Sequence, residues 1–187
     1  MPRAQQMFEA ASILSAFLSE AGIPHAFYGG ITCVALGSQQ DAEEIYCVVE
    51  GGFKGVRNAL QNCEIMTCST SSWSGRLYAT YHDPIPPIEI EILKAGETGP
   101  KRINGSNVMM LNRLPFLSIS EFIRAKMNSW LAHGSEGDAA DIIFVLSQYA
   151  QAVDINRIPE PEMERFVKLY PGEARQAWAT VRSRYGL

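Results

Sequence analysis

The sequence predicts a single α+β domain over residues 1–187, in which helices pack on a mixed β-sheet and a helical tail follows. Three observations indicate this fold. An amphipathic helical pattern opens the chain, several short strand-like segments follow, and helical spacing of apolar residues dominates from Glu121 onward. Strands collected ahead of a run of helices are typical of α+β proteins. We expect about 1–110 to form the sheet core and about 115–187 to form the tail.

The first third of the chain mixes helical and strand-like segments. Apolar residues three and four apart indicate helices, and β-branched or aromatic runs that end in glycine pairs indicate strands. In order, the sequence predicts a helix over 5–21, a strand over 24–28, a brief apolar segment over 31–36, a strand over 44–50 and a helix over 53–62.

The middle of the chain carries the clearest strand signal. Between Ile88 and Leu93, isoleucines alternate with Glu89 and Glu91 up to Ile92, so the isoleucines face one side of the sheet and the glutamates the other. Two further strands are expected around a Ser/Thr-rich turn, and the tail should be helical. These segments are strands over 64–68 and 76–81, and helices over 122–131, 139–150 and 160–184 with a break at Pro171-Gly172.

Composition limits the classes of partner. Hydrophobic residues make up 47% of the chain and charged residues 19%, which is enough apolar surface for a buried core. The net charge of −4, without a Lys/Arg block, argues against nucleic acid and against an anionic membrane surface as partners. No apolar run reaches the roughly 18–20 residues of a membrane span, and the N-terminus lacks the apolar core of a signal peptide. We expect a cytoplasmic protein that binds a small molecule.

Four segments occur in the order seen in one known family. The first is Tyr28-Gly29-Gly30, followed by a brief apolar segment and Gly37-Ser38. The second is Glu44-Ile45-Tyr46, and the third is Ile90-Glu91-Ile92-Leu93-Lys94-Ala95-Gly96. The fourth places Lys126 before a turn that leads to Asp138 and Asp141. Over roughly residues 10–149, this order resembles the minimal nucleotidyltransferases, including those of toxin–antitoxin systems.

The resemblance implies a magnesium site, which this sequence alters. In the family, the glycine turn receives nucleotide phosphates, and an acidic-hydrophobic-acidic triplet and an aspartate on a neighbouring strand hold two Mg²⁺ ions. Here Tyr46 replaces the second acid of the triplet, and Glu91 replaces the aspartate. A phenol titrates near pH 10 and is a poor ligand for a hard cation, and octahedral Mg²⁺ tolerates misplaced ligands badly. Gln40 and Ala42 stand where the family has basic and threonine residues, so we expect no metal and no cofactor.

Three functions are compatible with this pattern. The first is a cleft repurposed for metal-free acid–base chemistry of the isomerase, cyclase or hydrolase type. The second is an active Mg²⁺-dependent nucleotidyltransferase, and the third is a non-catalytic binding or regulatory domain. For the first we assign Glu44, Tyr46 and Glu91 as the catalytic residues. Expected ligand-binding residues are Tyr28, Gly29, Gly30, Gly37, Ser38, Glu89 and Lys126.

Simpler structural roles fit the same residues. Glu89 and Glu91 fit the solvated face of a half-exposed strand. Tyr46 fits a β-forming residue packed over the sheet. Lys126, Asp138 and Asp141 fit helix ion pairs that support the tail.

Overall fold

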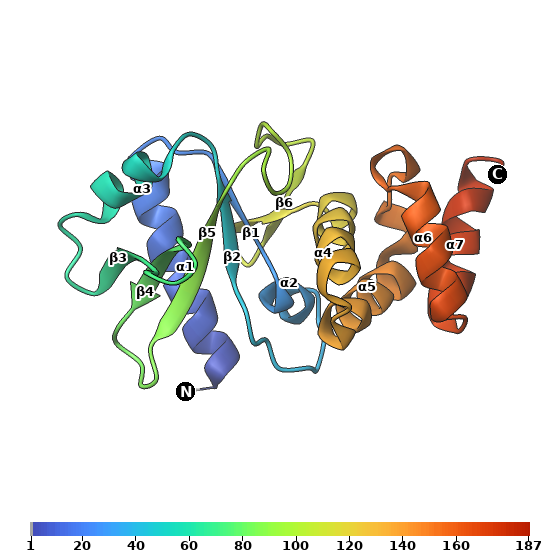
Figure 1. Cartoon of the computed structure of the whole chain (residues 1–187), viewed down its shortest axis with the longest axis horizontal. Coiled ribbons are helices and arrows are strands. Elements are labelled where there is room, and N and C mark those ends of the chain that lie inside the picture. Colours follow the sequence, from blue (N-terminus) through green and yellow to red (C-terminus); the bar gives the residue numbers. More distant parts are fainter. Residues whose placement is uncertain (1) are drawn as a thin grey trace. The chain divides into compact units, whose positions relative to one another are not determined.

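The structure is a computed structural model and describes residues 2–187 (Figure 1). By its internal contacts the chain forms two compact units, which we call the sheet unit and the helical unit. The sheet unit ends at Phe116, and the helical unit begins at Leu117. Each unit is described by itself.

The sheet unit contains a mixed seven-stranded sheet with the order β3-β4-β5-β2-β1-β7-β6. β1 pairs antiparallel with β2 and parallel with β7, and β2 pairs parallel with β5, so the sheet is mixed as predicted. The elements are α1 (Arg3–Glu20), β1 (His25–Tyr28), α2 (Gly30–Ala35), β2 (Tyr46–Val49), α3 (Phe53–Leu60), β3 (Met66–Thr70), β4 (Leu77–Tyr81), β5 (Ile88–Lys94), β6 (Val108–Leu111) and β7 (Leu114–Leu117).

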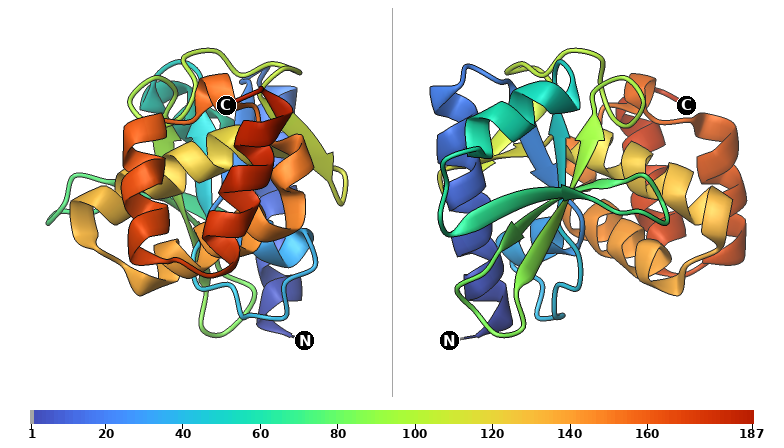
Figure 2. Two further views of the ribbon diagram at one scale, coloured as in Figure 1. Left: turned by 90° about the vertical axis from the view of Figure 1, so that its right-hand side faces the viewer. Right: turned by 60° about the vertical axis from the view of Figure 1, so that its left-hand side comes forward.

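Helices α1 and α3 cover one face of this sheet (Figures 1 and 2). The alternation in β5 explains why. Ile88, Ile90 and Ile92 are buried in the core of the sheet unit, together with apolar residues of α1. Glu89 and Glu91 point to the opposite face, because successive side chains of a strand alternate between faces. The α+β class predicted from the sequence is therefore confirmed, and the polar face of β5 lies away from α1.

The β6–β7 hairpin was not predicted from the sequence, which showed no clear strand pattern at Val108–Leu111 or Leu114–Leu117. Both segments are strands, joined by a two-residue turn in which Asn112 and Arg113 have φ values of 51° and 65°. Two positive φ angles are what the tight primed turns of hairpins require. The turn was overlooked because neither position holds glycine.

The helical unit contains four α-helices among its described residues. They are α4 (Ile119–His133), α5 (Glu136–Tyr149), α6 (Glu160–Leu169) and α7 (Glu173–Arg184). The break expected at Pro171-Gly172 separates α6 from α7. The ring of Trp130 on α4 packs edge-on against Phe166 on α6, with ring centroids 5.0 Å apart.

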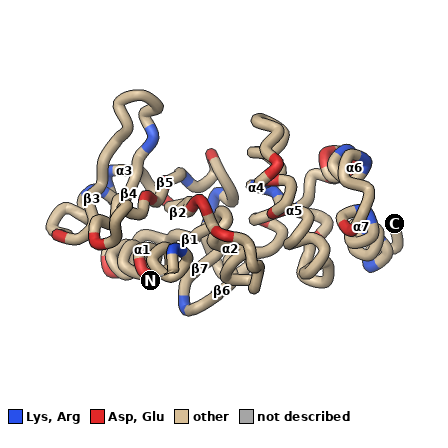
Figure 3. Tube along the Cα trace, turned by 90° about the horizontal axis from the view of Figure 1, so that it is seen from below, with Lys and Arg blue, Asp and Glu red and all other residues tan. Residues whose placement is uncertain are grey.

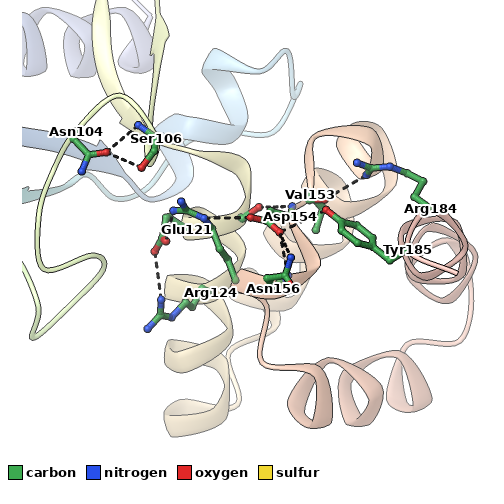
Figure 4. Close-up of polar contacts among 11 residues, drawn as sticks. Asn104, Ser106, Glu121, Arg124, Val153, Asp154, Asn156, Arg184 and Tyr185 are labelled. Carbon is green, nitrogen blue, oxygen red and sulfur yellow. Dashed lines mark hydrogen bonds and ion pairs between the residues drawn. The ribbon is translucent and has the colours of Figure 1, made fainter. Parts of the chain in front are cut away.

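Arginine contacts support the connection between α5 and α6 in the helical unit. Arg157 Nη1 lies 3.1 Å from the buried Glu121 Oε1, and Arg124 lies 3.8 Å from the other oxygen of Glu121. Arg184, near the end of α7, donates to the Val153 carbonyl (Figure 4). The contacts of Arg157 and Arg184 join α4 and α7 to the segment that follows α5, whereas the Arg124 contact lies within α4. No helix in the part of the chain that the structure describes has the length and apolar character to cross a membrane.

Candidate functional site

One row of side chains crosses four strands on the polar face of the sheet. Tyr28 on β1 is the register partner of Tyr46 on β2, and Tyr46 is the partner of Glu91 on β5. Glu91 is in turn the partner of Tyr78 on β4. Directly opposite residues of paired strands project to the same face. We call Tyr28, Tyr46, Glu91 and Tyr78 the tyrosine–glutamate row.

Tyr46 joins its neighbours through both its ring and its hydroxyl. The ring stacks on Tyr28, with centroids 4.8 Å apart and an interplanar angle of 28°. The hydroxyl donates a hydrogen bond of 3.0 Å to Glu44 Oε2. Glu44 itself lies just before β2, which begins at Tyr46 and not at Glu44 as the sequence predicted. The phenol is therefore oriented by a stacked ring on one side and a carboxylate on the other.

Glu91 carries the buried carboxyl group of the row. Its side chain is 11% exposed, and Arg76 Nη1 lies 3.3 Å from Glu91 Oε2. Burial raises the pKa of Glu91, the Arg76 guanidinium opposes that shift, and the negative charge of Glu44 adds to it. The negative charge of Glu44 therefore acts on the ionisation of Glu91, although the two residues come from different segments.

Arg76 lies at the start of β4, next to the row. Its side chain is 57% exposed. The Glu91 carboxylate raises the pKa of Arg76 most, followed by a hydrogen bond with Tyr78, and Tyr46 contributes as well. The guanidinium is therefore held among three members of the row. Arg76 and Tyr78 were not predicted as site residues from the sequence, because only the pairing of β4 with β5 brings them to Glu91.

The glycine turn after β1 lies against the segment that leads into β2. Gly29 has a φ of 108°, and a Cβ atom there would lie 2.9 Å from the Glu44 carbonyl oxygen and 3.1 Å from the Tyr46 ring. A Cβ on Gly30 would lie 3.4 Å from Ala42 Cα. The glycines thus allow two backbone segments to approach closely. Figure 3 shows acidic positions along the segment between α2 and β2.

The remaining predicted ligand-binding residues of the sheet unit are Gly37, Ser38 and Glu89, of which Glu89 shares the face of the row. Gly37 follows α2 with a φ of 99°, and Ser38 Oγ accepts a hydrogen bond from the backbone N–H of Gln40. Glu89 is exposed on the same face as Glu91, opposite Thr80. His82 lies beyond the other end of β4, where its Nε2 is 2.7 Å from Thr67 Oγ1.

Lys126 belongs to the helical unit, where it is buried. Its side chain is 2% exposed, and Nζ lies 3.0 Å from Asp138 Oδ1 and 2.9 Å from Asp141 Oδ2. A buried ammonium group needs such partners, because desolvation of an isolated charge is costly. The contacts join α4 to α5, which is the supporting arrangement considered for these three residues. A ligand-binding role for Lys126 stays a prediction.

The acidic and other metal-binding side chains of the described residues are dispersed. Among residues 2–187, no three His, Cys, Asp or Glu side chains come together as a group that could hold a metal ion. Glu44 and Glu91 are the acids of the row region, and a phenol and a guanidinium lie with them.

No protein-family model and no curated protein sequence matches the chain. Solved structures do match. JHP933 from Helicobacter pylori has a TM-score of 0.62 at 13% identity, and the match covers 100% of this chain and 96% of that one. The antibiotic-resistance factor ANT(2'')-Ia has a TM-score of 0.54 at 12% identity, over 100% and 95% of the two chains.

A third match names the fold directly. An antigenic nucleotidyltransferase-like protein from Paracoccidioides brasiliensis has a TM-score of 0.53 at 17% identity, over 94% of this chain and 88% of that one. At such identities, structural similarity establishes the fold and leaves activity open. The chain has the nucleotidyltransferase fold, as the four sequence segments predicted.

Proposed function

We propose that this nucleotidyltransferase-fold protein binds a small molecule on the tyrosine–glutamate row and transforms it by acid–base chemistry that needs no pair of metal ions. The observation that carries the proposal is the pairing of Glu91 with Arg76 beside Tyr46. In this arrangement a carboxylate oxygen that would face a cation already faces a guanidinium, at 3.3 Å.

The donor set does not fit a pair of Mg²⁺ ions. Mg²⁺ requires near-octahedral oxygen ligands at about 2.0–2.1 Å. The Tyr46 hydroxyl donates a hydrogen bond to Glu44, so one carboxylate oxygen of Glu44 is already occupied. A guanidinium at Glu91 adds a like charge next to any incoming cation. We therefore derive no step through a metal.

Glu91 has the properties of a general acid or base. Its pKa is raised, mainly by burial, and burial is one of the ways in which enzymes tune a carboxyl group for proton transfer. Tyr46 is positioned by Glu44 to donate a hydrogen bond to a ligand oxygen after a small rotation. Arg76, with N–H groups beyond the one on Glu91, is suited to hold a carbonyl or oxyanion of the ligand.

The proposal can be tested by finding and comparing bound metabolites. Native mass spectrometry of the purified full chain, incubated with a metabolite extract and EDTA, should reveal a bound or converted molecule. Glu91→Gln keeps the size of the side chain and removes its proton chemistry, so turnover of that molecule should fall by about 10²–10⁴-fold.

The test includes a control variant and two results that would contradict the proposal. Glu97→Gln changes an exposed glutamate paired with Lys94 and should leave turnover unchanged. Turnover that EDTA abolishes and added Mg²⁺ restores would contradict the proposal in favour of metal-dependent nucleotidyl transfer. A ligand that binds equally well to the Glu91→Gln variant and is never converted would favour a binding domain.

A further inference from the structure

We propose that Arg76 is a built-in counter-cation: its guanidinium supplies at Glu91 the positive charge that a metal ion would supply, and so excludes divalent cations from the strands β2 and β5. This inference rests on the proposed function, because both concern the same carboxylates. It goes further in predicting that the charge of this one arginine excludes the cation and that one substitution restores a cation site.

Glu91 needs a positive partner because it is buried. A carboxylate with an 11% exposed side chain loses much of its hydration, and a buried charge is tolerated when it is paired. The structure gives it Arg76 Nη1, at 3.3 Å from Oε2. The partner enters from the solvent side, since the Arg76 side chain is 57% exposed.

The position of Arg76 follows from the pairing of three strands. Tyr78 on β4 and Tyr46 on β2 are the register partners of Glu91 on its two sides. Arg76 precedes Tyr78 by two residues, so it projects from the β4 side toward Glu91. Both tyrosines also act on the ionisation of Arg76, which raises its pKa further. The guanidinium therefore lies on the same face as the row, with Nη1 at 3.3 Å from Glu91 Oε2.

A guanidinium and a divalent cation compete for the same oxygens. Arginine stays protonated at every physiological pH, so its charge is permanent. A metal ion bound to Glu91 would either displace Arg76 or bind with a like charge a few ångströms away. The repulsion between these two positive charges lowers the affinity for the metal ion. Loss of the charge at position 76 should free Glu91 and leave Glu44 as a second acid nearby.

An ordinary surface ion pair is the competing explanation. Exposed ion pairs contribute little to stability. The two explanations differ in what happens to cation affinity. If the pair is only a surface ion pair, removal of the Arg76 charge should change the affinity for divalent cations no more than the change in net charge explains. If Arg76 is a counter-cation, its removal should create a cation site that depends on Glu91.

Mn²⁺ is a suitable probe, because it prefers carboxylate oxygens and free Mn²⁺ gives an electron paramagnetic resonance signal that bound Mn²⁺ loses. Titration of the full chain with Mn²⁺ should show weak binding for the natural sequence. Arg76→Gln should bind at least about tenfold tighter, since removal of one adjacent charge changes a close ionic interaction by that order.

Three variants control this titration. Arg76→Lys keeps the charge and should bind Mn²⁺ as weakly as the natural sequence. Arg102→Gln removes another exposed arginine from a carboxylate pair, with Glu50 at 3.6 Å, and changes net charge equally. It should show no tenfold gain. Arg76→Gln combined with Glu91→Gln should lose the gained affinity.

The outcomes separate the two proposals. Equal, weak Mn²⁺ binding by the natural sequence and Arg76→Gln would overturn the role of Arg76 and leave the proposed function standing. Tight binding by the natural sequence, lost in Glu91→Gln, would overturn both. If Arg76→Gln fails to give the circular dichroism spectrum of the folded chain, Arg76→Met, which keeps the aliphatic stem, carries the same comparison.

Discussion

Tyr46 and Glu91 are register partners on the neighbouring parallel strands β2 and β5. One contributes a phenol that donates to Glu44, and the other contributes a buried carboxylate that pairs with Arg76. A single pair of opposite residues thus determines the chemistry of this face. Because a strand places its side chains with a period of two, the face offers a phenol where the resemblance implies an acid.

Glu91→Gln should change how stability depends on pH. Burial raises the pKa of Glu91, so the folded state binds its proton more tightly than the unfolded state does. The favourable contribution of protonated Glu91 is present below its unfolded pKa and is lost as pH rises through the folded pKa. The stability of Glu91→Gln relative to the natural sequence should therefore rise as the pH increases from the ordinary carboxyl pKa to above the raised pKa of folded Glu91. Urea unfolding across that range measures it, and a relative stability that falls with pH would contradict the burial of this carboxylate.

Gly29→Ala should destabilise the protein more than Gly37→Ala. Both glycines have positive φ, at 108° and 99°, so alanine is strained at either position and costs about 1–3 kcal/mol. At Gly29 the added Cβ also meets the Glu44 carbonyl, whereas nothing lies within 4 Å at Gly37. This collision should cost about 1–3 kcal/mol more. Equal unfolding free energies for the two variants would show that the close approach at Gly29 is relieved at no cost.

Lys126→Met should lower the free energy of unfolding by about 3–5 kcal/mol, because it leaves Asp138 and Asp141 charged without their buried partner. Lys168→Met, at an exposed position of α6, should change it by less than about 0.5 kcal/mol. Chemical denaturation of both variants makes the comparison. A Lys126→Met variant as stable as the Lys168→Met variant would argue that these carboxylates find other partners or take up protons.

His25 should make the sheet unit less stable in mild acid. Its Nδ1 lies 2.9 Å from the Ile23 carbonyl and must carry the proton, so Nε2, at 2.8 Å from Ser15 Oγ, accepts from that hydroxyl. Burial lowers the pKa of His25, and stability present at neutral pH is therefore lost as pH falls through the folded pKa.

The histidine variants isolate this effect. His25→Gln should flatten the decline in unfolding free energy as the pH falls below the ordinary histidine pKa, whereas His133→Gln, at an exposed position, should keep it. Thermal unfolding at several pH values gives the slopes. Identical slopes for His25→Gln and the natural sequence would contradict the assignment.

Local patterns predicted most of the fold. The alternation from Ile88 to Ile92 gave β5 and its polar face, and the order of glycine turn, altered triplet and glutamate strand gave the nucleotidyltransferase fold. The β6–β7 hairpin was missed because Asn112-Arg113 is an unusual sequence for a turn with two positive φ angles.

The site could be predicted only where it depends on segments with a recognisable pattern. Glu44, Tyr46 and Glu91 each lie in such a segment. Arg76 and Tyr78 do not, and their place beside Glu91 depends on the register between β4 and β5. That register follows from packing of the whole sheet, since a slip of one residue would turn Tyr78 to the other face.

Transfer of radiolabelled AMP tests the central claim most directly. The folded full chain is incubated with Mg²⁺ and ATP labelled at the α-phosphate, with host extract as a source of acceptors, and labelled products are resolved by gel electrophoresis and thin-layer chromatography. A site with a phenol at Tyr46 and a guanidinium at Glu91 predicts no protein-dependent labelled product. Stable labelling that disappears with Glu44→Ala would contradict this account.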